Sequence, residues 1–167
     1  MKPEDLITYC GLYGGCCARY RGYTVFREAA ALMAEIADAH GFQYWLVEAA
    51  KEFDYGEFRK GLEFFRRDDA WLVCQDCCKG GSGGPPNCVR DCCRRHQVDV
   101  CFECAEFPCE RVRADAGMMR RAEEYKTLGR AEWLRRAAEA ARQGRELHTG
   151  KYYRIVISDA PPDPEER

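Results

Sequence analysis

Residues 74–109 read CQDCCKGGSGGPPNCVRDCCRRHQVDVCFECAEFPC and contain nine of the twelve cysteines in a chain of 167 residues. The other three cysteines are Cys10, Cys16 and Cys17. An intracellular protein does not need twelve cysteines for packing, and a reducing compartment would not keep them as disulfides. Their clustering therefore favours metal or redox chemistry over the alternative, small buried side chains that only fill space.

Two C-x2-C pairs are the strongest motif in this segment. They are Cys74 with Cys77 and Cys101 with Cys104. Two intervening residues let both sulfurs of a pair reach one tetrahedral zinc ion at about 2.3 Å. Because more cysteines lie between and beyond the pairs, one four-coordinate site would leave ligands over. We therefore predict about two zinc ions, with the N-terminal cysteines tied to the Cys-rich segment and with folding coupled to metal binding.

The predicted ligands fall into two groups. The first group is Cys10, Cys17, Cys74, Cys77, Cys88, Cys92, Cys101, Cys104 and Cys109. Further candidates are Cys16, Cys78, Cys93 and His96. The three additional cysteines belong to doublets, in which successive side chains diverge, so we expect one ligand and one spare thiol from each doublet. His96 is included because imidazole also suits zinc.

The choice between zinc and an iron–sulfur cluster stays open, because four thiolates serve both. Bacterial ferredoxins carry a C-x2-C-x2-C-x3-C-P run, which this chain lacks, and Pro108 precedes Cys109 instead of following it. This favours zinc in a structural or regulatory module. The alternative is an iron–sulfur electron-transfer or thiol-redox protein. No carboxylate pair, triad or phosphate-binding loop indicates another enzymatic activity, so enzymatic activity stays open.

The segment before the cysteines is predicted to be helical from about residue 24 to 66. Thr24 is expected to cap a helix that runs to about His40 and stops at Gly41. The face expected in the core carries Phe26, Ala29, Ala30, Met33 and Ile36. A second helix is expected from Phe42 to about Phe53. Asp54, with Glu57 three residues later, has the capping spacing of a third helix.

Residues 110–145 are predicted to form two helices, with breaks at Gly117, Gly129 and Gly144. Between residues 111 and 145 there are ten Lys or Arg and five Asp or Glu. A solvated helix face explains this excess most simply, and a surface that docks a protein partner is the alternative. Residues 151–157 are aromatic and β-branched, which predicts one short edge strand.

Together these patterns predict a mainly α-helical single domain over residues 1–158, with an irregular Cys-rich metal-binding insert at 74–109 and a disordered tail at 159–167. The net charge of −2 argues against a dedicated nucleic-acid binder. No stretch approaches the roughly 20 apolar residues of a membrane span. The acidic N-terminus is unlike a secretory signal, so a cytoplasmic location is expected.

Four motifs resemble the Cys-rich family catalogued as domain of unknown function 3795. They are Tyr9-Cys10-Gly11-Leu12 with Cys17, Cys74-x2-Cys77, Cys88-Val89-Arg90-Asp91-Cys92, and Cys101-x2-Cys104-x2-Phe107-Pro108-Cys109. The resemblance spans roughly residues 9–135, with a weaker match at Gly129 and Trp133, and implies metal binding without naming a function. Gly14 stands where the family has its middle N-terminal cysteine, and Cys78 and Cys93 are additions to the family pattern.

Overall fold

The structure is a computed structural model that describes residues 2–75, 79 and 89–157. The described part is mainly helical, as predicted. Its α-helices are α1 (Val25–Ala39), α2 (Phe42–Ala49), α3 (Tyr55–Arg66), α4 (Arg90–Arg95), α5 (Ala116–Leu128) and α6 (Arg130–Arg142). Its short 3-10 helices include η1 (Pro3–Leu6), η2 (Gly14–Cys16) and η4 (Cys101–Glu103). The predicted ligands Cys77, Cys78 and Cys88 and the predicted tail at 159–167 lie outside the described residues.

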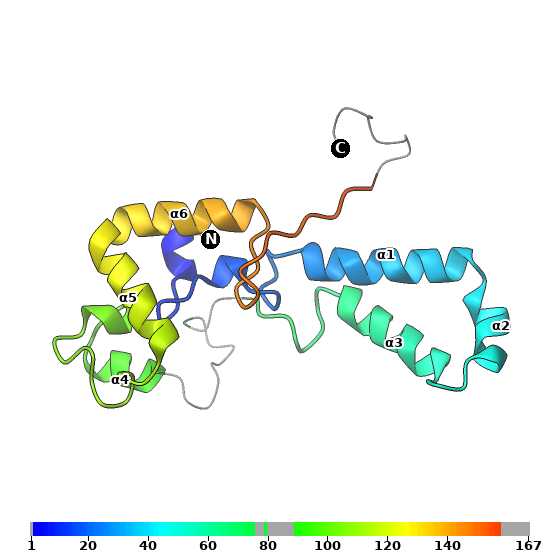
Figure 1. Ribbon diagram of the computed structural model, residues 1–167, viewed down its shortest axis with the longest axis horizontal. Helices are drawn as coiled ribbons and strands as arrows, with labels where there is room; N and C mark the ends of the chain where they lie inside the picture. The colour runs from blue at the N-terminus through cyan, green and yellow to red at the C-terminus, as the bar shows by residue number, and fades with distance from the viewer. Residues whose placement is uncertain (1, 76–78, 80–88, 158–167) are drawn as a thin grey trace.

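Helices α1 and α3 lie side by side, and α2 joins their far ends (Figure 1). Gly41 ends α1 as predicted, with a φ of 65° that side chains other than glycine disfavour. Asp54 caps α3 as predicted, because its Oδ1 accepts the Glu57 N–H at 2.9 Å. A bidentate contact from Arg59 to Asp38 connects the two long helices, at 2.9 and 2.7 Å. The Thr24 side chain makes no capping hydrogen bond, so that detail of the prediction was wrong.

The apolar face predicted for α1 was also wrong in part. Helix α1 buries Ala30, Ala34 and Ala37, whereas Phe26 is 42% and Met33 52% exposed. The buried cluster between α1 and α3 consists of Ala30, Ala34 and Leu62 only. A helix packed closely against a single neighbour covers one narrow stripe, and here that stripe is the row of alanines. The large side chains beside it stay at the surface.

Helices α5 and α6 meet at Gly129, as predicted, where a φ of 74° interrupts the helical path. Asp115 caps α5 by accepting the Met118 N–H at 2.8 Å. Gly117 lies inside α5 and does not break it. A single glycine costs a helix only about 1 kcal/mol relative to alanine, which the cap at Asp115 offsets.

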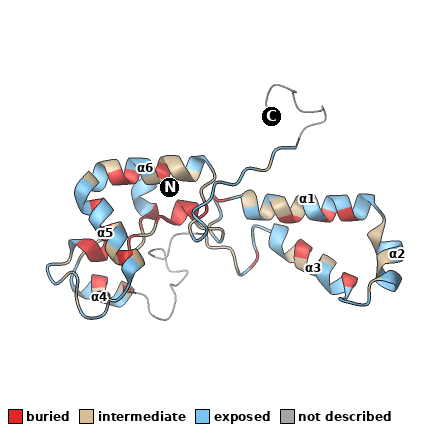
Figure 2. Cartoon of the chain, viewed as in Figure 1, coloured by how far each residue is buried: buried red, intermediate tan, exposed pale blue. Residues whose placement is uncertain are grey.

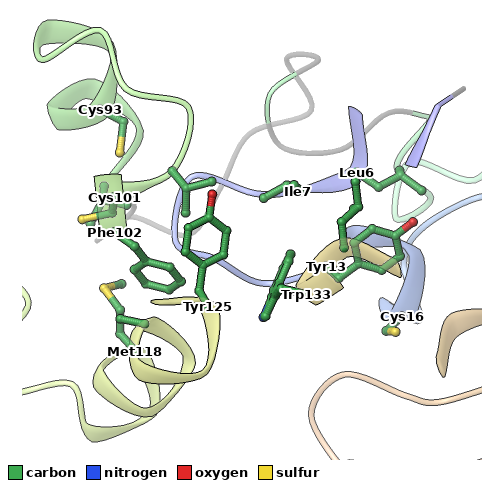
Figure 3. Packing of buried hydrophobic residues seen from close by; sticks show 14 of the residues in the cluster. Leu6, Ile7, Tyr13, Cys16, Cys93, Cys101, Phe102, Met118, Tyr125 and Trp133 are labelled. Atoms are coloured by element: carbon green, nitrogen blue, oxygen red, sulfur yellow. The ribbon is translucent and has the colours of Figure 1, made fainter. Parts of the chain in front are cut away.

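The largest core combines the N-terminal segment, the Cys-rich segment, α5 and α6, and it contains most of the buried residues (Figure 2). Figure 3 shows its central row, which runs from Cys93 and Cys101 at one end to Tyr13 and Cys16 at the other. Edge-to-face contacts join the rings of Trp133 to Tyr125 at 5.6 Å and of Tyr125 to Phe102 at 5.7 Å.

The insert is therefore less irregular than predicted. It carries α4 and η4, and Val89, Val100 and Phe102 belong to the main core. Its alternating cysteines and apolar residues bury against α5, a contact that local composition does not reveal. The predicted edge strand is absent from the described residues, where residues 151–157 make one isolated antiparallel bridge between Arg145 and Tyr152. A row of β-branched residues needs a partner strand, and the loop after α6 supplies only one pairing.

In the described part of the chain, no helix is long and apolar enough to cross a membrane.

Candidate metal centre

Five cysteines line one small cavity between α4, η4 and the turn that follows η4. They are Cys92, Cys93, Cys101, Cys104 and Cys109. His96, Glu106 and two apolar side chains complete the wall, and the cavity has a volume of about 10 Å³, which is room for about one water-sized sphere. Helix α4 presents the Cys92–Cys93 doublet, and the C-x2-C turn of η4 presents Cys101 and Cys104.

The thiols in this cavity influence each other's protonation. Burial, together with the neighbouring Cys109, Cys92 and Cys104, raises the pKa of Cys101 to about 11. Burial likewise raises the pKa of Cys93 to about 12. Near neutral pH both groups keep their protons, so an ion that bound thiolates here would have to displace them.

The two cysteines of the doublet differ in their surroundings. Cys93 is 1% exposed and belongs to the main core, where its Sγ lies 3.8 Å from the Tyr9 carbonyl oxygen, to which it donates. Cys92 is half-buried. Both thiols line the cavity, and Cys93 is the more deeply buried of the two.

Among the residues described here, no three His, Cys, Asp or Glu side chains form a group that could hold a metal ion. None of the nine described cysteines is in a disulfide. Binding of an ion at the cavity would therefore require its sulfurs to move toward a common point. His96 Nδ1 lies 3.9 Å from Glu106 Oε1, a contact between two members of the same wall.

The N-terminal cysteines do not line this cavity. The backbone N–H of Cys101 donates to the Tyr9 carbonyl at 2.9 Å, so the segment before Cys10 is fixed against η4. Cys16 lies at the opposite end of the core, and Leu147 N–H donates to its carbonyl at 2.8 Å (Figure 3). A backbone hydrogen bond thus joins the N-terminal segment to the Cys-rich segment, and the predicted attachment through shared metal ligands stays a prediction.

Cys74 also lies away from the cavity. Its N–H donates to the Arg19 carbonyl at 2.7 Å, and its carbonyl accepts the Arg21 N–H at 2.9 Å. This pairing brings Cys74 close in the fold to the segment that follows Cys17. Cys74 is therefore not part of the cavity that Cys101 and Cys104 line.

Gly11 allows the N-terminal segment to approach η4. Its φ is 72°, and a Cβ atom at this position would overlap ring carbons of Phe102. We expect Gly11→Ala to lower the free energy of unfolding by about 2–4 kcal/mol, the sum of backbone strain and overpacking. Gly150→Ala is the matched control, since Gly150 has a φ of 66° and its nearest atom would be 3.9 Å away. Denaturant titration of both variants measures the difference in their free energies of unfolding. Equal losses of stability would contradict the role assigned to the contact with Phe102.

Sequence reasoning identified all five cavity cysteines as ligands or candidates, but it did not predict that they meet in one place. It missed Glu106 and the apolar wall, for which the sequence carries no signal beyond proximity to Cys104 and Cys109.

A family model described as "Protein of unknown function (DUF3795)" matches residues 6–114 of the chain. This range includes all the described cysteines and confirms the resemblance carried by the four motifs, while Gly129 and Trp133 fall outside it. No curated protein and no solved structure matches the chain.

Proposed function

We propose that this chain, which belongs to the DUF3795 family of proteins of unknown function, is a zinc-binding structural or regulatory module. The observation that carries this proposal is the cavity lined by five cysteines from α4, η4 and the following turn. Thiolate sulfur is the donor that structural zinc sites use most, and four such donors complete a tetrahedral shell.

The ligands we assign to this cavity are Cys92, Cys101, Cys104 and Cys109. The influence of Cys92, Cys104 and Cys109 on the pKa of Cys101 supports their closeness to it, and Cys93 also lies close, because it hydrogen-bonds to Cys101. Cys93 is assigned as the spare thiol of its doublet, since its Sγ donates to the Tyr9 carbonyl oxygen. When bound, zinc would cross-link α4 to η4 and add no redox chemistry of its own.

Positive charge near the cavity supports the same assignment. Four thiolates around one divalent cation carry a net charge of −2, which neighbouring cations stabilise. Helix α4 carries Arg90, Arg94 and Arg95. Lys126 Nζ lies 5.2 Å from the centre of the Phe107 ring, and Phe107 lines the cavity.

A second zinc ion remains a proposal. Its donors would be Cys10, Cys17, Cys74, Cys77 and Cys88, of which the last two lie outside the described residues. Because Cys74 pairs with the segment after Cys17, two of these donors, Cys17 and Cys74, come from neighbouring segments of the chain, which supports a shared ion.

An iron–sulfur cluster is the alternative occupant, because the same four thiolates would hold it. The test is elemental analysis of protein purified without oxygen, read together with the visible absorption spectrum. We expect about two zinc per chain and no colour. Iron with acid-labile sulfide and a brown chromophore would favour the iron–sulfur electron-transfer function over the zinc module. Protein free of both metals would overturn the proposal.

A further inference from the structure

A second and larger cavity is lined by Trp133 and by none of the five cysteines of the candidate metal centre. It is formed by the N-terminal segment, α5, α6 and the segment after α6, and it has a volume of about 380 Å³. Pockets for small organic ligands commonly measure about 300–1000 Å³. The cavity is therefore large enough for a small molecule and is separate from the candidate metal centre.

Arginine dominates the polar part of its described lining. Arg120 and Arg121 come from α5, Arg136 from α6 and Arg145 from the segment after it, whereas Glu124 contributes one carboxylate. Four guanidinium groups around one concave surface create a positive potential that concentrates anions. A solvated helix face, the simpler interpretation of the basic excess at 111–145, would not gather these groups around a cavity.

The pairing of these arginines leaves donors available. Arg136 Nε contacts Glu132 Oε1 at 2.7 Å, and Arg145 hydrogen-bonds to the Cys16 thiol. Within residues 2–75, 79 and 89–157, neither Arg120 nor Arg121 forms an ion pair, and the buried Nε of Arg121 has no hydrogen-bond partner. A buried donor without a partner is uncommon in folded proteins, so the protein itself leaves part of this guanidinium unsatisfied.

The thiol in the rest of the wall carries no negative charge, and the remaining lining offers apolar surface. Burial raises the pKa of the Cys16 thiol, so this group remains neutral. Trp133, Leu12 and Leu147 form apolar parts of the lining, and Tyr152, which is 57% exposed, stands at the solvent side. An aromatic ring at the entrance can stack on a flat organic group.

We propose that this cavity binds a small phosphorylated organic molecule whose phosphate groups contact Arg120, Arg121 and Arg145. A guanidinium group binds phosphate through two parallel hydrogen bonds. A cluster of arginines therefore favours a phosphate ligand over a ligand with a single carboxylate. The apolar wall accepts the organic part. The proposal does not depend on the metal, because none of the five cysteines of the candidate metal centre lines this cavity.

Calorimetric titration of the full chain with ADP, inorganic pyrophosphate, citrate and adenosine tests the proposal. We expect ADP to bind more tightly than pyrophosphate, adenosine not to bind at millimolar concentration, and ADP affinity to fall as salt is raised. Absence of binding by both ADP and pyrophosphate would overturn the proposal. Binding of citrate alone would overturn the assignment of phosphate.

Arginine variants test whether ADP binds in this cavity. Arg120→Gln and the double change Arg120→Gln with Arg121→Gln are expected to weaken ADP binding by at least about 10-fold, one lost charge-assisted contact or more. Arg120 is exposed and lies outside the hydrophobic core, so its single variant keeps the fold. Arg135→Gln is the matched control, because Arg135 is on α6, pairs with Glu132 at 2.8 Å and does not line the cavity. Equal affinities of all variants would show that ADP binds elsewhere and would contradict the proposal.

Discussion

Removal of the proposed zinc by a chelator is expected to unfold the main core while changing the α1–α3 pair little. Cys93 and Cys101 belong both to the cavity wall and to this core, so loss of the cross-link between α4 and η4 exposes the ring of Phe102. In small zinc domains the metal contributes about 10 kcal/mol or more to folding. The N-terminal segment should loosen as well, because it is held to η4 by the Cys101–Tyr9 hydrogen bond.

Amide hydrogen exchange with and without chelator measures this effect residue by residue. We expect protection in α5 and α6 to fall at least 100-fold, which corresponds to about 2.7 kcal/mol. Helices α1 and α3 have their own cluster of Ala30, Ala34 and Leu62 and the Arg59–Asp38 contact, so their exchange should change less. Restoring zinc is the control. Unchanged circular dichroism and unchanged protection of α5 after complete metal removal would rule out coupling between metal and fold.

The aromatic row explains why loss of the metal should reach so far. Phe107 lines the cysteine cavity and contacts Phe102, whose ring centre is 5.5 Å away. Phe102 contacts Tyr125 of α5, which contacts Trp133 of α6, and Trp133 lines the arginine-rich cavity. Adjacent rings share one packed core, so disorder at one end removes contacts along the whole row.

Local signals predicted three of the helix boundaries, whereas the second helix ends at Ala49 instead of about Phe53. Gly41, Asp54 and Gly129 act through their own backbone or side chain, so their effect can be predicted from neighbouring residues. The buried face of α1 could not be predicted in the same way. The apolar pattern of Phe26 and Met33 is compatible with burial, but the position of α3 decides which stripe is covered.

The same distinction applies to the two cavities. The spacing of Cys101 and Cys104 predicted that these thiols act together, because the motif is local. That Cys92 and Cys109 share their cavity depends on how α4 packs beside η4, which spacing alone does not determine. The arginine-rich cavity joins Leu12 to Arg120 and Arg145, so only the tertiary fold brings its residues together.

The Cys92–Cys93 doublet provides the sharpest test of the ligand assignment. Cys92→Ala is expected to reduce bound zinc by about one ion per chain, since a four-thiolate shell then lacks a ligand. Cys93→Ala is the matched control, one residue away on the same helix and on the same cavity. It should retain the ion and lose about 1 kcal/mol of stability, as for a small deletion in a core. Elemental analysis of the two purified variants gives the comparison.

Misfolding must be separated from loss of a ligand, because Cys93 is 1% exposed in the core. Cys104→Ala serves this purpose, since Cys104 is half-buried and lies outside the buried core cluster. We expect it to lose the ion as Cys92→Ala does, while Cys16→Ala, a buried cysteine at the far end of the core, keeps the ion in this cavity. Retention of the full zinc content by Cys92→Ala and Cys104→Ala would exclude this cavity as the zinc site. Loss of zinc only from a Cys93→Ala variant that stays folded would instead make the core thiol the ligand and Cys92 the spare, because the doublet supplies one sulfur to the shell.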